Sequence, residues 1–103
     1  MMKRYMPLIN YIITYANEKD KSIIGRELGD RFSLSEFTVR QYINEARSDG
    51  FAVCSCHRGY YYSADGKDLD ETIRSLRGRI EKLEMALCGL YSIRSKMVVE
   101  DNE

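Results

Sequence analysis

The sequence predicts a mainly helical protein with one small β-hairpin, an α+β fold, followed by a long C-terminal helix of the coiled-coil type. Three observations favour this class. Apolar residues recur at helical spacing through the first half of the chain. A short run that ends in three consecutive tyrosines then has the residue preference of β-strands. Beyond it, leucine and isoleucine repeat at gaps of four and three residues.

The length and the charge limit the classes of function. A chain of 103 residues forms one domain with a small core, and an additional element extends from it or pairs with another copy. Sixteen basic residues balance sixteen acidic ones, with 9 against 8 up to residue 66 and 7 against 8 after it. This neutrality counts against strong non-specific DNA binding, although charges clustered on one face would still suffice.

The compartment and the cysteines point to an ordinary cytosolic protein. The chain has no apolar run long enough for a membrane span, and residues 1–5 lack the apolar block of a secretion signal. We therefore expect a cytoplasmic protein.

The cysteines do not form a zinc-binding pattern. Cys54, Cys56 and Cys88 lack a two-pair zinc spacing. Cys54, Cys56 and His57 lie in one strand and cannot surround an ion without a distant fourth ligand. We expect reduced thiols, no metal and no cofactor.

Two helices with a short connection are predicted in the first third of the chain. The first spans residues 6–17, with Pro7 in its opening turn and a continuous apolar stripe of Leu8, Ile9, Ile12, Ile13 and Ala16. Residues 18–22 form a solvated connection, and the β-branched pair Ile23 and Ile24 follows. The second helix spans residues 25–32, with Leu28 and Phe32 on its inner face.

A third helix is predicted from Ser35 to Gly50. Ser35 is the expected cap of its first turn, and the capping-box spacing of Ser33 and Glu36 leaves open a start one or two residues away. Gly50 ends the helix. The inner face consists of Val39, Tyr42, Ile43 and Ala46.

The outer face of the third helix carries side chains suited to DNA: Phe37, Arg40, Gln41, Asn44, Arg47 and Ser48. Arginines bind phosphates or guanine edges, and Gln or Asn binds adenine edges. Phe37 points outward near the helix start. It contacts a thymine methyl group, anchors a protein partner, or folds back against the second helix or a symmetry mate, and the sequence leaves all three open.

A hairpin follows Gly50, with strands at residues 51–56 and 60–63 and a turn at His57, Arg58 and Gly59. Alternation places Val53 and Ser55 on one face of the first strand and Ala52, Cys54 and Cys56 on the other. Arg58 at the tip, with His57 beside it, is the expected contact to phosphate or the minor groove. Helix, tight turn, helix and hairpin together make residues 24–62 a winged helix-turn-helix. Ile23 and Ile24 then form a short strand that pairs with the hairpin.

Four segments carry a family resemblance: IGREL at 24–28, SEFTVRQYI at 35–43, SDGF at 48–51 and GYYY at 59–62. Over residues 6–63 the chain resembles the winged-helix domains of biotin-repressor-like bacterial regulators, and it is similar to small winged-helix proteins of bacteriophages and prophages. The resemblance implies that the wing residue Arg58 reaches the DNA backbone or minor groove. It also implies that one set of residues faces the major groove or its phosphates: Ser35, Glu36, Phe37, Thr38, Arg40 and Gln41.

The remainder of the chain, residues 67–103 after a winged-helix domain of residues 1–66, is expected to be a dimerisation helix. Asp68 caps it, with Glu71 at capping-box spacing, and the helix runs to Met97 before an acidic, frayed tail at 98–103. Its apolar residues form a heptad seam: Leu69, Ile73, Leu76, Ile80, Leu83, Leu87 and Leu90.

In that seam Ile73, Ile80 and Leu87 occupy heptad position a, and Leu76, Leu83 and Leu90 occupy position d, a pattern that favours a two-stranded coil. Arg79 at g faces Glu84 at e of a parallel partner. Past Met85 the apolar surface widens, which indicates contact with the first helix or a second dimer. The alternative is a single helix lying across the core of its own domain.

These features predict a non-enzymatic homodimer, or a higher oligomer, that binds specific duplex DNA for transcriptional or replication control in a bacteriophage or mobile element. The alternative is a winged-helix module that binds a host protein through Phe37 and inhibits host machinery or defence. An enzyme is not expected, because the chain has no paired-carboxylate, Ser-His-Asp or Gly-rich phosphate-binding signature.

Overall fold

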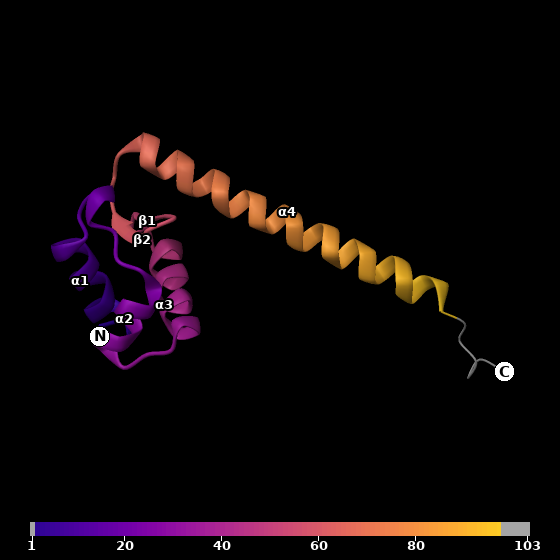
Figure 1. Cartoon of the computed structure of the whole chain (residues 1–103), viewed down its shortest axis with the longest axis horizontal. Helices are drawn as coiled ribbons and strands as arrows, with labels where there is room; N and C mark the ends of the chain where they lie inside the picture. The colour runs from indigo at the N-terminus through magenta and orange to yellow at the C-terminus, as the bar shows by residue number, and fades with distance from the viewer. Residues whose placement is uncertain (1, 98–103) are drawn as a thin grey trace. The chain divides into compact units, whose positions relative to one another are not determined.

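The computed structural model describes residues 2–97. The elements in chain order are α1 (Met6–Tyr15), the 3-10 helix η1 (Lys19–Lys21), α2 (Gly25–Phe32), α3 (Glu36–Ser48), β1 (Val53–Cys56), β2 (Gly59–Tyr62) and α4 (Gly66–Lys96) (Figure 1). The mainly helical class, with one antiparallel hairpin and a long C-terminal helix, is confirmed. The tail at 98–103, expected to fray, lies outside the described residues.

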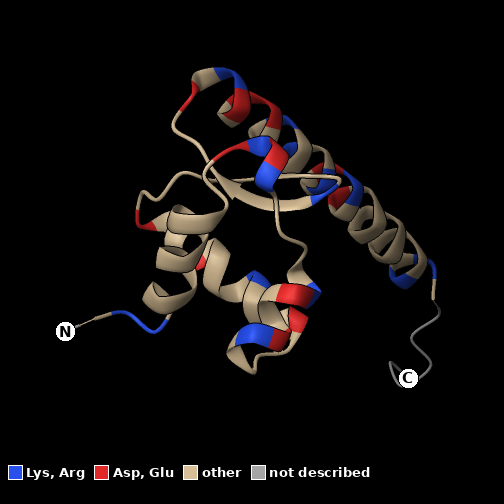
Figure 2. Cartoon of the chain, turned by 60° about the vertical axis from the view of Figure 1, so that its left-hand side comes forward, with Lys and Arg blue, Asp and Glu red and all other residues tan. Residues whose placement is uncertain are grey.

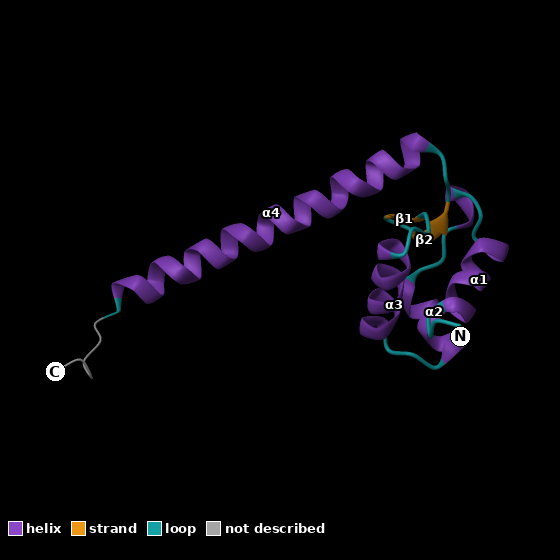
Figure 3. Ribbon diagram, turned by 180° about the vertical axis from the view of Figure 1, so that it is seen from behind, coloured by secondary structure: helices purple, strands orange, loops and turns teal. Residues whose placement is uncertain are grey.

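The chain divides into two compact units, Met1–Thr72 and Ile73–Glu103. The boundary therefore falls inside α4, whereas the sequence suggested one in the linker before it. In the first unit, α1, α2 and α3 surround a shared core and the hairpin covers one end of them (Figure 3). The core consists of Tyr5, Leu8, Ile9, Ile12, Ala16, Leu28, Val39, Ile43, Ala46, Val53, Cys54 and Tyr61.

The predicted helices form close to their expected bounds. Helix α2 has the expected bounds, and Ser33 ends it in a left-handed conformation with φ 57°. Ser35 caps α3, because its Oγ accepts a hydrogen bond from the Thr38 amide at 3.0 Å. The alternative start that uses Ser33 and Glu36 is thereby excluded. Helix α1 ends at Tyr15, two residues earlier than expected.

The hairpin differs from its prediction in three respects. Its strands are Val53–Cys56 and Gly59–Tyr62, against the predicted 51–56 and 60–63. Its turn has two residues, His57 and Arg58, because Gly59 already pairs with Cys56. The three-residue turn was wrong. Val53 and Cys54 are both buried, so β1 does not alternate between an inner and an outer face. The reason is tertiary: β1 packs against α3 on one side and is covered on the other by core residues of the first unit.

Both outer edges of the hairpin are occupied. On β2, Tyr60 exchanges two backbone hydrogen bonds of 2.9 Å with Ile23, which confirms the short strand predicted there. On β1, the Ser55 amide donates to Thr72 Oγ1 at 3.2 Å. Because unpaired strand edges invite association with other chains, these contacts close both sides of a two-stranded sheet.

The start of α4 lies earlier than predicted. The helix begins at Gly66, and the Leu69 amide donates to the Asp65 carbonyl at 3.0 Å. Asp68 was wrongly predicted as the cap. It lies in the first turn and accepts a 2.8 Å hydrogen bond from Ser63 Oγ. Glu71, predicted to complete the capping box, pairs with Lys19 at 3.3 Å.

Leu69 also departs from the predicted seam. It packs against the core of the first unit and thus serves to attach the opening turns of α4 to that core. Thr72, the next inward residue, is only 4% exposed. The free part of the seam therefore begins at Ile73, where the second unit starts.

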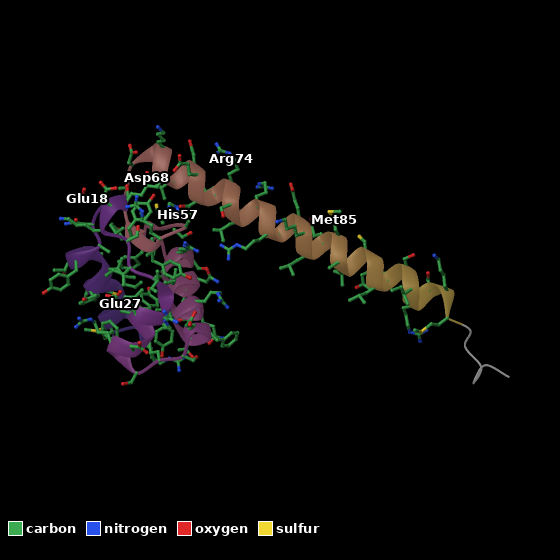
Figure 4. All side chains as sticks on the ribbon, viewed as in Figure 1. Glu18, Glu27, His57, Asp68, Arg74 and Met85 are labelled. Carbon is green, nitrogen blue, oxygen red and sulfur yellow. The ribbon has the colours of Figure 1, made fainter. Side chains whose placement is uncertain are left out.

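The second unit, described by itself, is the rest of α4. Figure 4 shows its side chains, Met85 among them, projecting from a single helix. Five of its seam side chains have exposed fractions between 49% and 70%: Ile73, Ile80, Leu83, Leu87 and Leu90. Leu76 is partly exposed. Within residues 2–97, no helix has the length and apolar character that crossing a membrane requires.

Candidate nucleic-acid interface

Helix α3 presents one polar face outward and one apolar face inward. Val39, Ile43 and Ala46 are 0% exposed. Because residues three and four apart share a helix face, Phe37, Gln41 and Asn44 form a row opposite the buried side. All three are exposed, and Arg40 flanks the row, also exposed. This arrangement agrees with the predicted outer face.

Phe37 keeps its aromatic ring in solvent. Its side chain is 63% exposed, and no ring contact involves it, whereas Phe32 stacks edge-on against Tyr11 at 5.7 Å between centroids. Folding back against α2, one of the three possibilities left open by the sequence, is therefore wrong. A nucleic acid, a protein partner or a second copy remains as what would cover it.

The first turn of α3 is occupied by its own cap. Ser35 Oγ accepts from the Thr38 amide and donates to Thr38 Oγ1, both at 3.0 Å. These two predicted DNA-contacting residues thus fix the helix start. Glu36 lies exposed beside them, where its negative charge stabilises the positive end of the helix dipole. The same charge opposes a close phosphate at this point.

Arg47, predicted as a DNA contact, has a structural role. Its Nε donates to the Val53 carbonyl at 2.8 Å and its guanidinium reaches Ser55 Oγ at 3.4 Å, so it joins α3 to β1. Asn44 Oδ1 accepts from the same guanidinium at 3.3 Å, which leaves the Asn44 amide group facing outward. Arg40 and Gln41 are consequently the polar side chains of this face best placed to reach bases or phosphates.

A tight joint holds α3 against α2. The Leu34 amide donates to the Gly29 carbonyl at 2.8 Å, and a Cβ on Gly29 would lie 2.5 Å from the Leu34 carbonyl oxygen. Only glycine fits there without moving backbone. The turn between the two helices is therefore held against the last part of α2 by backbone contact.

The C-terminal end of α3 is held by Tyr5. The buried Tyr5 hydroxyl donates to Asp49 Oδ2 at 2.6 Å, and Lys3 lies 3.5 Å from the same carboxylate oxygen. This hydrogen bond to a carboxylate is the main cause that raises the pKa of Tyr5 to about 12. The same bond lowers the pKa of Asp49 below its usual range. The contact joins residues 44 positions apart.

The hairpin tip carries the other predicted contacts. His57 and Arg58 are both exposed. Arg58 Nη1 lies 3.7 Å from Asp20 Oδ1, an ion pair between two exposed side chains that contributes little energy and is readily exchanged for a phosphate. Figure 2 shows basic and acidic positions interspersed along the described elements.

The cysteines and His57 do not converge. Cys54 is buried, which raises the pKa of its thiol, and Cys56 Sγ lies 3.3 Å from Ser22 Oγ. His57 points to solvent, and Cys88 lies exposed on α4. Over the part of the chain that the structure describes, no group of three metal-binding side chains comes together.

Sequence reasoning missed three residues that position this face: Tyr5, Gly29 and Thr72. For Tyr5 there was a signal, because it precedes Leu8 and Ile9 at helical spacing and so extends the stripe of α1 by one turn. Thr72 had no such signal in the sequence, since its partner Ser55 lies 17 residues earlier.

Compared with known proteins, the chain matches no protein-family model, no curated protein and no solved structure.

Proposed function

We propose that this protein binds specific duplex DNA as a homodimer, with α3 as the helix that enters the major groove and the hairpin as a wing on the adjacent backbone. The observation that carries the proposal is the outer face of α3. It combines Phe37, Arg40 and Gln41 in solvent with an inner face on which Val39, Ile43 and Ala46 are buried and Tyr42 is partly buried, on a helix fixed at both ends. Rigid presentation of a few base-reading side chains is what direct readout requires.

The pairing of subunits is assigned to α4. From Ile73 onward its apolar side chains at heptad positions a and d are exposed, a pattern that is stable in water only when a second helix covers it. Two copies joined in this way carry two reading helices, so the DNA site consists of two half-sites. Control of transcription or replication in a bacteriophage or mobile element is the role we assign to such a dimer.

Selection of bound sequences from a pool of random duplex DNA tests this function. A motif with two related half-sites is the expected product, because a twofold dimer reads a twofold site. Titration of a fluorescent duplex carrying that motif then gives the affinity at several salt concentrations. Absence of both an enriched motif and any binding to duplex DNA at low salt contradicts the proposal.

The arginines of the first unit give matched variants. Arg40→Ala weakens binding to the selected duplex by roughly 1–3 kcal/mol if Arg40 reads a base edge. Arg58→Ala weakens binding to all duplexes alike. It also reduces the slope of the logarithm of the binding constant against the logarithm of the salt concentration by about the amount expected for one phosphate contact. Arg74→Ala is the control, because it removes the same charge from an exposed b position of α4 outside the predicted interface. Equal loss in all three variants contradicts the assignment of α3.

Arg47→Ala separates folding from recognition. Because Arg47 joins α3 to β1, its removal lowers the midpoint of urea unfolding, whereas Arg40→Ala leaves that midpoint unchanged. A loss of DNA binding in Arg40→Ala without a loss of stability thus identifies a contact residue.

A second function is favoured by one observation, the exposed ring of Phe37 on a chain with no net charge. Exposed aromatic side chains are frequent anchors of protein interfaces. On this alternative the outer face of α3 binds a protein, such as a component of host machinery or defence. A stoichiometric partner captured from bacterial lysate, lost in Phe37→Ala and retained in Arg40→Ala, together with no DNA motif, supports it over DNA binding.

A further inference from the structure

The two halves of α4 differ in the residues that flank the seam. Up to residue 84 the flanking e and g positions carry Arg77, Arg79 and Glu84. From Met85 to Ile93 no residue is charged, and the flanking positions become apolar: Ala86, Tyr91 and Ile93. The apolar strip of positions a and d therefore widens in the C-terminal half to a face that also includes e and g.

This wide face is exposed in the single chain. Leu87 is 49% exposed, Leu90 64%, Tyr91 66% and Ile93 55%. A two-stranded coil buries positions a and d and only the edges of e and g, so it leaves much of this face in water. An apolar face of this width is typical of helices in four-helix bundles. Charged side chains at e and g keep the N-terminal half in the two-stranded form.

Charges at the ends of the uncharged segment set a direction. Glu81 and Glu84 precede the segment, and Arg94 and Lys96 follow it. Within each parallel dimer Arg94 at position a already faces its own copy, and a second dimer running in the same direction would bring further like charges beside it. In an antiparallel overlap, Leu87 of one chain can lie level with Leu90 of the opposing chain. This register places Arg94 beside Glu84 of the opposing chain. The two side chains have opposite charges and therefore attract each other.

We propose that two α4 dimers join tail to tail through the apolar face at residues 86–93, which makes the protein a tetramer, with a second copy of the dimer as the partner. This proposal rests on the dimer of the proposed function and adds a second interface to it. Each dimer contributes its own pair of first units, which are attached by the chain at the N-terminal ends of α4. One tetramer thereby holds two DNA segments.

Sedimentation equilibrium without DNA tests the assembly separately from DNA binding. The wild-type chain is expected at four times its mass of 12.0 kDa. Ile93→Glu places a charge in the wide face and halves the mass to that of a dimer, whereas Ser92→Glu, the adjacent f position, leaves the tetramer intact. Leu83→Glu lies in the seam and gives a monomer. Circular dichroism confirms that each variant keeps its helical first unit.

Two results overturn the tetramer. One is a wild-type dimer at every concentration up to several hundred micromolar, and the other is an equal effect of Ile93→Glu and Ser92→Glu. A wild-type monomer overturns the dimer as well. DNA binding with a wild-type dimer leaves the proposed function standing without the tetramer.

A mixing experiment tests the antiparallel direction. Glu84→Lys and Arg94→Glu each place like charges at the proposed tail-to-tail contact, so each variant alone shows a lower tetramer fraction. Mixed in equal amounts, the two variants restore opposite charges and recover the tetramer. If mixing restores nothing, the tail-to-tail arrangement is wrong.

Discussion

At the scale of single residues, Tyr5 and Asp49 connect the start of α1 to the end of α3. The Tyr5 hydroxyl is neutral when it donates this hydrogen bond, and its pKa of about 12 in the folded chain lies above the ordinary value of 10.0. A group whose pKa is raised by folding stabilises the fold below its unfolded pKa. We therefore expect this stabilisation to be complete below about pH 10 and to be lost as the pH rises toward 12.

Tyr5→Phe tests this contact. The variant is less stable than wild type at neutral pH, and the difference shrinks above pH 10. It also shrinks in acid as Asp49 is protonated, because folding lowers the pKa of that carboxyl and its stabilisation is present only above its unfolded pKa. Urea unfolding at several pH values measures the difference. Tyr15→Phe is the control, since Tyr15 is 60% exposed, and an equal effect of both changes contradicts the role of Tyr5.

Gly59 is a second residue on which the fold depends, because the backbone of Ile23 passes close to it. It has φ 126°, and a Cβ there would collide with the backbone carbonyl of Ile23. Gly59→Ala is expected to destabilise by more than about 1 kcal/mol, because strained backbone and a backbone collision add. Gly50→Ala is the matched control: Gly50 has φ 98° but open space around it. If the two variants unfold at the same urea concentration, the close approach of Ile23 is unimportant.

At the scale of elements, the opening turns of α4 act as a lateral support for the hairpin. Thr72 Oγ1 accepts from the Ser55 amide and lies 3.5 Å from the Ser55 carbonyl oxygen, and Leu69 packs against the core. The first two turns of α4 are thus fixed to the hairpin and the core within the first unit, by side-chain contacts as well as by the chain.

Thr72→Val tests this support. The change keeps the shape of the side chain and leaves the partly buried Ser55 amide without its partner on the buried Thr72, so it costs roughly 1–3 kcal/mol of stability. Thr14→Val, the same change on the exposed side of α1, shifts stability by less than about 0.5 kcal/mol. Thermal unfolding followed by circular dichroism gives both values. A Thr72 variant as stable as the Thr14 variant contradicts the support.

At the scale of the whole molecule, the second unit is an exposed helix. Among its described residues, 73–97, the helix has no tertiary partner, and it contains Gly78 and Gly89, each of which weakens a helix by about 1 kcal/mol relative to alanine. An isolated helix of this kind is only partly formed in water. We expect the helical signal at 222 nm to increase from about 1 to several hundred micromolar chain as subunits associate.

Leu83→Glu removes this concentration dependence, because it places a charge in the seam, while Lys82→Ala at an outer position preserves it. A helical signal that is the same at all concentrations in the wild-type chain contradicts association through α4.

Elements set by local pattern were predictable from the sequence. Ser35 as a cap and α2 with its bounds follow from residue preferences and spacing over a few positions, whereas the pairing of Ile23 with Tyr60 was expected only from the winged-helix arrangement as a whole. The start of α4 was not predictable, because Asp65 and Asp68 offer equally good local signals, and only the contact between Asp68 and Ser63 shows which one lies inside the helix.

The sequence by itself determined the fold class, the helices and the inner and outer faces of α3, because apolar spacing is a local property that survives in any tertiary context. The tertiary structure alone decided the uses of individual polar side chains. It assigned Arg47 to the hairpin, Tyr5 to Asp49, Thr72 to Ser55 and Leu69 to the core. Such choices depend on which distant backbone or side-chain groups come within hydrogen-bonding or packing distance, and that is fixed only when the whole unit closes around its core.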